Sequence, residues 1–201
     1  MGEHLIVRED NCKGCRRCEV ACIAAHHGLT MKEAMKKRDQ YLSRVQVIKT
    51  DTFKTTVRCH QCENAPCCQI CPTGAISQLE NGEIVTNRGL CMACGMCMHA
   101  CPYGCIQIED GDVELMASPR AGGDQCPVAF TPAAVVEGGL CVMHPAHKSP
   151  VRCDLCKEWR ALTGKEYTAC MEACMANAVV LQREDGSILE CPKPEKKAKA
   201  E

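Results

Sequence analysis

Short runs of apolar residues, set between polar ones, recur along the chain and predict short strands and helices. Residues 43–49 (SRVQVIK) and 54–58 (KTTVR) alternate apolar and polar side chains, which predicts a hairpin of two half-buried strands. Residues 4–9 (HLIVRE) predict a further strand, and residues 178–189 (AVVLQREDGSIL) predict a second hairpin that turns at Asp185–Gly186. Both ends of the chain are therefore expected to contribute strands.

Helical signals follow the first predicted strand. Residues 19–27 (EVACIAAHH) predict a helix. Thr30 and Glu33 form a capping-box signature, which predicts the start of a second helix over residues 31–38.

The middle of the chain repeats a small unit. Residues 72–87 predict a short helix, a strand, a turn at Asn81–Gly82 and another strand, and residues 102–110 (PYGCIQIED) predict a second copy of the helix–strand pair. Residues 111–150 contain five prolines and two Gly–Gly pairs, which predicts an irregular insert. This insert is interpreted as a long ordered loop for partner docking.

Composition changes this picture, because the apolar positions are unusually poor in large side chains. Only 3% of the 201 residues are aromatic, whereas 21 are cysteines. A core of this size normally relies on aromatic rings for buried area, so something else must hold it together. The odd number of cysteines excludes a fully paired set of disulfides. No secretory signal and no run of about 18 apolar residues is present, so we expect a cytoplasmic protein without a membrane span.

Most of the cysteines fall into four groups of four. The groups are Cys12, Cys15, Cys18 and Cys22; Cys59, Cys62, Cys67 and Cys71; Cys91, Cys94, Cys97 and Cys101; and Cys153, Cys156, Cys170 and Cys174. The first and third have the C-x2-C-x2-C-x3-C spacing of bacterial ferredoxins, and the other two are variants of it. Three cysteines at this spacing occupy three corners of one Fe4S4 cube, while the fourth ligates the neighbouring cluster. Such groups therefore work in pairs.

The pairing predicts the domain organisation. The second and third groups are adjacent and form one module, so the first and fourth must pair across it. The predicted fold class is α+β, with two bacterial-ferredoxin-like 2[4Fe-4S] modules, one inserted in the other. The expected parts are an outer module of residues 1–53 and 151–190, an inner module of residues 54–110, the irregular insert of residues 111–150 and a flexible tail of residues 191–201.

The segments CHQCENAPCCQICPTGAIS, CMACGMCMHACPYGC and CDLC resemble those of four-cluster ferredoxin subunits of the dimethyl sulfoxide reductase type. CKGCRRCEVAC with the following AHH and KEAMKK is most similar to the ferredoxin-like partner of carbon monoxide dehydrogenase. The resemblance implies four [4Fe-4S] clusters whose ligand sets cross between groups. These sets are Cys12, Cys15 and Cys18 with Cys174; Cys153, Cys156 and Cys170 with Cys22; Cys59, Cys62 and Cys67 with Cys101; and Cys91, Cys94 and Cys97 with Cys71.

The resemblance also implies a function. Because no nucleotide-binding fingerprint, P-loop or nucleophile elbow is present, we expect no catalytic site. The chain is expected to carry electrons between a catalytic subunit, of the carbon monoxide dehydrogenase, formate dehydrogenase or hydrogenase type, and a second redox subunit or soluble carrier. Association with a membrane would come through a partner. The alternatives are a freely diffusing polyferredoxin, a zinc-structured interaction protein and an enzyme with an open iron site.

The charge of the chain does little to distinguish between these alternatives. The formal net charge is −1, and cluster-bound thiolates would add negative charge, so no nucleic-acid partner is expected. Residues 31–58 carry eight Lys/Arg and three Asp/Glu. This excess is interpreted either as a solvated face or as a docking edge for an acidic partner.

The remaining cysteines and several histidines have simpler interpretations. Cys68 and Cys105 are expected to be packed thiols, whereas the role of Cys191 stays open. Cys126, Cys141, His144 and His147 form a candidate extra metal site, although their spacing matches no common zinc pattern. His26, His27, His60 and His99 flank the cysteine groups and are interpreted as neighbours of ligands or as surface residues.

Overall fold

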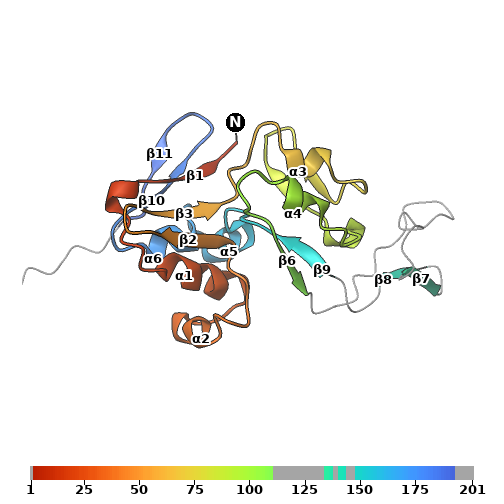
Figure 1. Cartoon of the computed structure of the whole chain (residues 1–201), viewed down its shortest axis with the longest axis horizontal. Coiled ribbons are helices and arrows are strands. Elements are labelled where there is room, and N and C mark those ends of the chain that lie inside the picture. The colour runs from red at the N-terminus through yellow and green to blue at the C-terminus, as the bar shows by residue number, and fades with distance from the viewer. Residues whose placement is uncertain (1, 111–133, 138–139, 144–147, 193–201) are drawn as a thin grey trace, which may run out of the picture. The chain divides into compact units, whose positions relative to one another are not determined.

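The strands predicted at the two ends of the chain pair with each other in the structure, a computed structural model that describes residues 2–110, 134–137, 140–143 and 148–192. Strand β1 (His4–Val7) pairs antiparallel with β10 (Val179–Gln182), which also pairs with β11 (Ile188–Leu189) (Figure 1). The register places Leu5 opposite Leu181 and Val7 opposite Val179. Leu5, Val180 and Leu181 are buried, so this sheet contributes a core to the part of the chain that contains both ends.

The chain divides into two units. Unit 1 consists of Met1–His60 and Cys153–Glu201, and unit 2 of Gln61–Arg152. Both combine short helices with antiparallel strands, so the fold class is α+β, as predicted. The interpretation of these units as nested ferredoxin modules stays a prediction.

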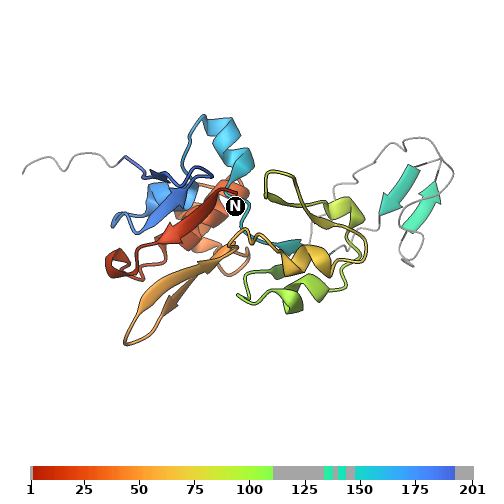
Figure 2. The same ribbon diagram turned by 90° about the horizontal axis from the view of Figure 1, so that it is seen from above.

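Unit 1 contains most of the helical residues. Its remaining elements are η1 (Glu9–Asn11), α1 (Arg17–His26), α2 (Met31–Lys36), β2 (Val45–Lys49), β3 (Lys54–Arg58), α5 (Lys157–Thr163) and α6 (Ala169–Ala173). The predicted hairpin β2–β3 is confirmed, and Figure 2 shows it extending from the rest of unit 1. Helix α1 packs against both α2 and α6.

The capping box at the start of α2 is also confirmed. The Glu33 backbone N–H donates to Thr30 Oγ1 at 3.3 Å, and the Thr30 backbone N–H donates to Glu33 Oε2 at 2.9 Å. Ala34 is fully buried against Val20 and Ile23 of α1. Helix α2 is therefore held by its first turn and by one small apolar contact.

Unit 2 consists of helices and two-stranded sheets. Its elements are α3 (Pro66–Gln69), β4 (Ile76–Gln78), β5 (Ile84–Thr86), η2 (Arg88–Leu90), α4 (Met96–Ala100), β6 (Gln107–Asp110), β7 (Ala134–Glu137), β8 (Leu140–Met143) and β9 (Lys148–Val151). The pairs are β4–β5, β6–β9 and β7–β8.

The predicted positions of two short helices are wrong. The short helices expected after Cys71 and after Cys101 lie before them, as α3 and α4. Pro66 starts α3 in its first turn, whereas the residues that follow Cys71 turn at Gly74 with a positive φ of 65°.

The described parts of the stretch 111–150, expected to be irregular, contain β7, β8 and the first residues of β9; β7 pairs with β8, and β9 pairs antiparallel with β6. Between Cys156 and Cys170 of the fourth cysteine group the chain forms α5, which ends at Gly164 with a positive φ of 66°.

The core is made of small side chains. The largest fully buried side chains are those of Ile76, Met171, Leu181, Val180 and Thr168. Among the described residues no aromatic side chain is buried, whereas many cysteines are. No helix in the described ranges has the length and apolar character that a membrane crossing requires.

Candidate metal centre

Four thiols of unit 2 converge on one cavity. Its lining includes Cys91, Cys94 and Cys97 of the third group together with Cys71 of the second. These four residues are one of the predicted crossing sets. The turn between them contains Ala93 and Gly95 in the left-handed region, with φ of 56° and 73°, which lets the chain fold tightly around the cavity.

Burial and the neighbouring thiolates disfavour the ionised form of two of the thiols that line this cavity. Burial raises the pKa of Cys91, and the neighbouring thiolates of Cys71 and Cys94 raise it further. Burial and the thiolates of Cys91, Cys94 and Cys71 raise the pKa of Cys97 in the same way. At Cys71 burial also opposes ionisation, but hydrogen bonds, including those of the Ile76 and Thr73 backbone, lower its pKa.

A second group of thiols is buried in unit 1. Cys22 lies on α1, Cys153 and Cys156 lie on the loop before α5, and Cys170 lies on α6, and all four are buried. Burial raises the pKa of Cys153, Cys156 and Cys170, and in each case the thiolate of Cys22 raises it further. These residues are also one of the predicted crossing sets, although 131 positions of sequence separate Cys22 from Cys153.

The donor atoms fit an iron–sulfur cluster. Both groups offer four sulfur atoms, which is the soft ligand set that holds such clusters. Backbone N–H groups already point at several of these sulfurs, from Arg44 to Cys22 Sγ at 3.3 Å and from Ala93 to Cys91 Sγ at 3.4 Å. Such hydrogen bonds stabilise a thiolate. A bound cation would also offset the repulsion that raises the pKa of the buried thiols.

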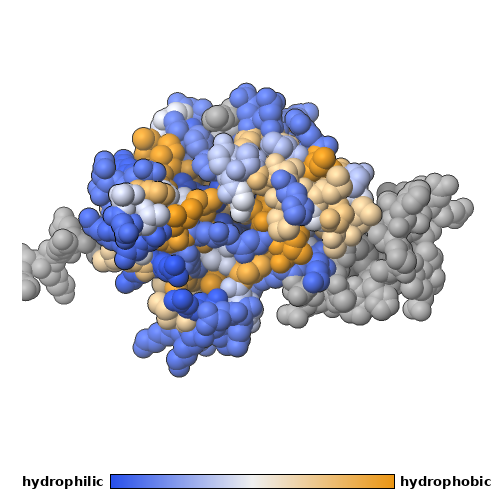
Figure 3. Space-filling view, viewed as in Figure 1, coloured by the Kyte–Doolittle hydropathy of each residue, from blue (hydrophilic) through white to orange (hydrophobic). Residues whose placement is uncertain are grey.

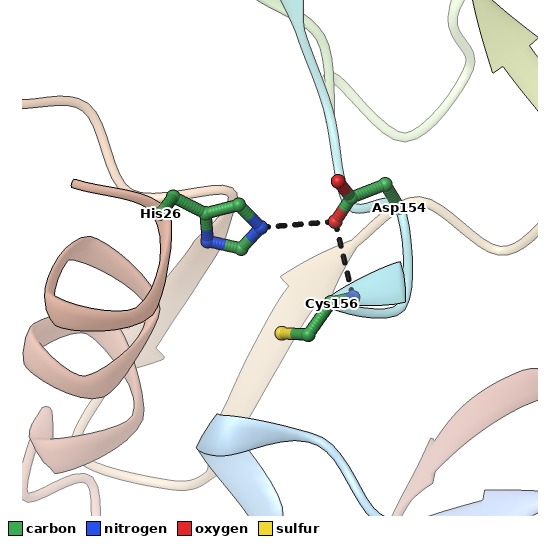
Figure 4. Close-up of side chains that lie close together, drawn as sticks. All are labelled: His26, Asp154 and Cys156. Atoms are coloured by element: carbon green, nitrogen blue, oxygen red, sulfur yellow. Dashed lines mark hydrogen bonds and ion pairs between the residues drawn. The ribbon is translucent and has the colours of Figure 1, made fainter. Parts of the chain in front are cut away.

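A charged network lies beside Cys22 and Cys156 of the unit 1 group, and Figure 4 shows its residues His26 and Asp154 with Cys156. His26 Nε2 lies 3.0 Å from Asp154 Oδ1, while His26 Nδ1 lies 2.7 Å from the Cys22 carbonyl oxygen and 3.6 Å from Cys22 Sγ. Arg44 pairs with Asp154 Oδ2, and the Cys156 backbone N–H donates to Asp154 Oδ1 at 3.1 Å. Asp154 therefore ties α1, the segment before β2 and the loop of the fourth cysteine group together.

The network holds His26 in its charged form. Both ring nitrogens face oxygen acceptors, an arrangement that the two N–H groups of the charged ring satisfy. Although burial opposes the charge, hydrogen bonds to Asp154 and Cys22 raise the pKa of His26 to about 10. Burial likewise opposes ionisation of Asp154, but His26 and Arg44 hold the pKa of that carboxyl well below its usual range. One ligand atom from each of His26, Asp154 and Cys156 lies within 4.8 Å of the others. In Figure 4 Asp154 accepts hydrogen bonds from the His26 ring and from the Cys156 backbone N–H, so it supports the loop that contains the predicted ligand Cys156.

Comparison with known proteins identifies the family. Residues 50–119 match the 4Fe-4S dicluster domain. YsaA of Escherichia coli, named as a candidate electron transport protein, is 35% identical over 179 residues, which cover 89% of this chain and 88% of YsaA. The chain belongs to the 4Fe-4S ferredoxin-type subunits. The electron transport protein HydN of E. coli is 31% identical over 181 residues (90% of this chain, 87% of HydN). Formate hydrogenlyase subunit 2 of E. coli is 31% identical over 183 residues (90% and 82%).

Membership of this family settles the general role. The chain is an iron–sulfur protein and a non-catalytic electron-transfer component, as the sequence predicted. Family membership by itself specifies neither the partner nor the number of clusters.

For the other two predicted sets, the structure defines the surroundings of single cysteines. In the set of Cys12, Cys15, Cys18 and Cys174, burial and neighbouring charges, including the Cys170 and Cys15 thiolates, raise the pKa of Cys18 to about 12. Cys174 Sγ accepts a hydrogen bond from the Ala178 backbone N–H at 3.2 Å. The set of Cys59, Cys62, Cys67 and Cys101 is divided between the two units. Both sets stay predictions.

The remaining cysteines and histidines have varied positions. His26 is a neighbour of Cys22, as interpreted, and His60 and His99 are exposed. The ring of His27 lies 4.2 Å from that of Tyr41. Cys105 and Cys191 are buried and Cys68 is half-buried. Cys126, His144, His147 and the side chain of Cys141 lie outside the described residues, so the candidate extra metal site stays a prediction.

Sequence reasoning missed Asp154 and Arg44. Asp154 lies inside the C-D-L-C segment, and a carboxylate between two predicted ligands is a signal that could have been noticed. Nothing in the local sequence pairs it with His26, which lies 128 positions away.

Proposed function

We propose that this chain is an electron-transfer subunit with four [4Fe-4S] clusters, held by the four crossing sets of cysteines given above. The observation that carries the proposal is the convergence of Cys71, Cys91, Cys94 and Cys97 on one cavity, with a second buried group formed by Cys22 and three cysteines of the last group. Each group unites cysteines from different parts of the sequence, as the crossing pattern requires.

The chain's own residues would hold and tune the clusters. A [4Fe-4S] cluster, when bound, accepts and returns one electron. The thiolates would fix each cluster, and backbone N–H groups such as those of Arg44 and Ala93 would donate hydrogen bonds to ligand sulfurs. Burial of Cys22, Cys153, Cys156 and Cys170 would exclude water from their cluster, whereas Cys15 and Cys94 are exposed and would bring the sulfur of two other sets to the surface.

We further propose that the chain works between a catalytic subunit and an electron acceptor or donor. One relative is named a subunit of formate hydrogenlyase and another an electron transport protein, which supports work beside a redox complex. The catalytic partner would be of the carbon monoxide dehydrogenase, formate dehydrogenase or hydrogenase type, and the other partner a second redox subunit or a soluble carrier. The location proposed is the cytoplasm, with any contact to a membrane made through a partner.

Iron content tests the number of clusters. Anaerobically purified chain is expected to be brown and to carry about sixteen iron atoms per molecule, four for each cluster, with little zinc. An iron content near eight would limit the chain to one pair of clusters. Colourless protein with about one zinc for every four cysteines would overturn the proposal in favour of a zinc-structured protein.

Purification from native cells separates a bound subunit from a freely diffusing polyferredoxin. A bound subunit is expected to elute in mild salt together with a catalytic oxidoreductase subunit. Elution of all iron-loaded chain as a monomer, with no associated redox enzyme, would contradict the role of a complex subunit.

A further inference from the structure

Five basic residues lie close to an exposed cysteine of unit 1, either in the same loop or on a hairpin packed against that loop, and the electron-transfer role has not explained them. We propose that these side chains form a docking surface for an acidic redox partner, which exchanges electrons with the chain at Cys15. The inference rests on the proposed function, since it takes Cys15 as a cluster ligand. The basic collar, as we name this surface, consists of Lys13, Arg16, Arg17, Lys49 and Lys54.

Two segments far apart in sequence build the basic collar. Lys13, Arg16 and Arg17 are exposed on the loop that contains Cys15, which is itself exposed. Lys49 and Lys54 come from the β2–β3 hairpin and pack over this loop. A Cβ atom at Gly14 would lie 3.4 Å from Lys49 Cδ and 3.5 Å from Lys54 Cδ. The positive charges therefore gather at the surface where a predicted ligand sulfur meets solvent.

Within the part of the chain that the structure describes, the side chains of the basic collar have no acidic partner in an ion pair. Among the described residues, none of its five side chains forms an ion pair, whereas Arg8, Arg160, Lys165 and Arg183 of the same unit each pair with a glutamate.

The collar also contains a repulsive pair and few acidic neighbours. Lys49 and Lys54 are directly opposite each other in the hairpin register, which is an unfavourable arrangement of like charges. Glu9, Asp10, Glu19 and Asp51 are the acidic residues nearest in sequence, so the five basic residues outnumber them by one. A partner with carboxylates would relieve this repulsion.

Cys94, the other predicted ligand that is exposed, has no such basic neighbours in the surrounding sequence. Basic residues therefore do not accompany every exposed predicted ligand of the chain. Cys94 lies beside Met96 and Met98, which are 42% and 36% exposed. No charged residue occurs in residues 89–108. Figure 3 shows hydrophobic atoms gathered over α3 and α4. The collar thus gives one exposed ligand a charge that would steer an acidic partner towards it.

Electron exchange with an acidic protein tests the basic collar. The probe is a soluble acidic [2Fe-2S] ferredoxin. The chain, reduced with dithionite that is then removed, is mixed with oxidised probe. The reverse mixture is also measured, so that one direction is always downhill. Each exchange oxidises one cluster of one protein and reduces the cluster of the other by one electron. The second-order rate is measured by stopped flow at low and high salt.

Matched charge reversals give the comparison. The test variant is Lys13→Glu/Lys49→Glu/Lys54→Glu, which leaves the left-handed Arg16 untouched. The control variant is Lys32→Glu/Lys36→Glu/Lys37→Glu, which makes the same change of charge at α2, a hydrophilic protrusion in Figure 3. The test variant is expected to react at least about tenfold more slowly than the unmodified chain at low salt, and the control within about threefold. High salt should bring all rates together.

The possible results distinguish a failure of the docking surface from a failure of the proposed function. The docking surface would be overturned by equal rates for the test and control variants, or by a rate for the unmodified chain that salt does not change. The proposed function would still stand in that case if the chain carries iron and can be reduced. An unmodified chain without iron would overturn both. If the test variant loses iron, Lys49→Gln/Lys54→Gln replaces it, because this pair lies outside the cysteine loop. That variant is expected to lower the rate about threefold at low salt, and no change would overturn the inference.

Discussion

Replacing His26 with glutamine is expected to lower the midpoint potential of one cluster. The charged ring lies 3.6 Å from Cys22 Sγ, and the same ring pairs with Asp154. Asp154 is also paired with Arg44, so removing the charge of His26 leaves a neutral pair beside the predicted cluster. A positive charge favours the reduced cluster, which carries one more electron. Its loss therefore makes reduction harder.

The magnitude follows from Coulomb's law. An added electron is spread over the cluster, and we take it to lie about 7 Å from the His26 charge. At an effective dielectric constant of about 20, this interaction contributes about 2 kcal/mol, which corresponds to about 100 mV for a one-electron couple. Glutamine retains an N–H donor, so the comparison isolates charge from hydrogen bonding. His26→Ala removes both and is expected to shift the potential at least as far.

Potentiometric titration followed by electron paramagnetic resonance measures this effect. One midpoint should fall by about 100 mV in His26→Gln, while the others move by less than about 20 mV. His99→Ala is the matched control, because this histidine is exposed on α4 of unit 2 and the structure gives it no such pairing. If all midpoints of His26→Gln stay within about 20 mV of the unmodified protein, or if one rises, the placement of His26 beside a cluster is refuted.

Three further predictions use iron content and stability. Cys97→Ser is expected to lose one cluster, or about four iron atoms, whereas Cys68→Ser should retain the full content; loss of iron in the second variant would show that the ligand register of the second group is wrong. Thr30→Ala removes the capping box of α2 and should destabilise unit 1 by about 1 kcal/mol, seen as a lower Tm, whereas Thr30→Ser should retain most of the stability; equal Tm values would contradict the capping role. Gly14→Ala, at a φ of 63°, should lower the free energy of unfolding by about 1 kcal/mol, and an unchanged Tm would show that residue 14 does not need the left-handed conformation.

Local signals were enough to predict much of the fold. The hairpin β2–β3, the strands at both chain ends, helix α1 and the capping box of α2 are each determined by residues close in sequence, and each is confirmed. The cysteine spacing, together with the family resemblance, predicts a ligand set of Cys71 with Cys91, Cys94 and Cys97; these four residues line one cavity, and their role as ligands stays a prediction.

The structural features that were predicted wrongly or missed depend on competing local turns or on contacts between residues far apart in sequence. Pro72 suggested the start of a helix, but the chain turns after Cys71 and the helix forms earlier, where Pro66 occupies the first turn. The pairing of β6 with β9 joins residues about 40 positions apart across a segment with no clear pattern. The ion pair of His26 with Asp154 joins two ends of the chain, and neither residue has a local signal for the other. Contacts of this kind arise only when the fold closes.

The closure of unit 1 and the assembly of its thiol group are the same event. Cys22 on α1 meets Cys153, Cys156 and Cys170 only when the first sixty residues pack against the last segment of the chain. The β1–β10 ladder and the His26–Asp154 pair close the same junction. The buried core there consists of Ala21, Ala169 and Cys156, with the half-buried Trp159 packed against it, and burial raises the pKa of the thiols. Metal binding by these thiols would therefore supply stability that the apolar core does not, so cluster loss should open this junction of unit 1.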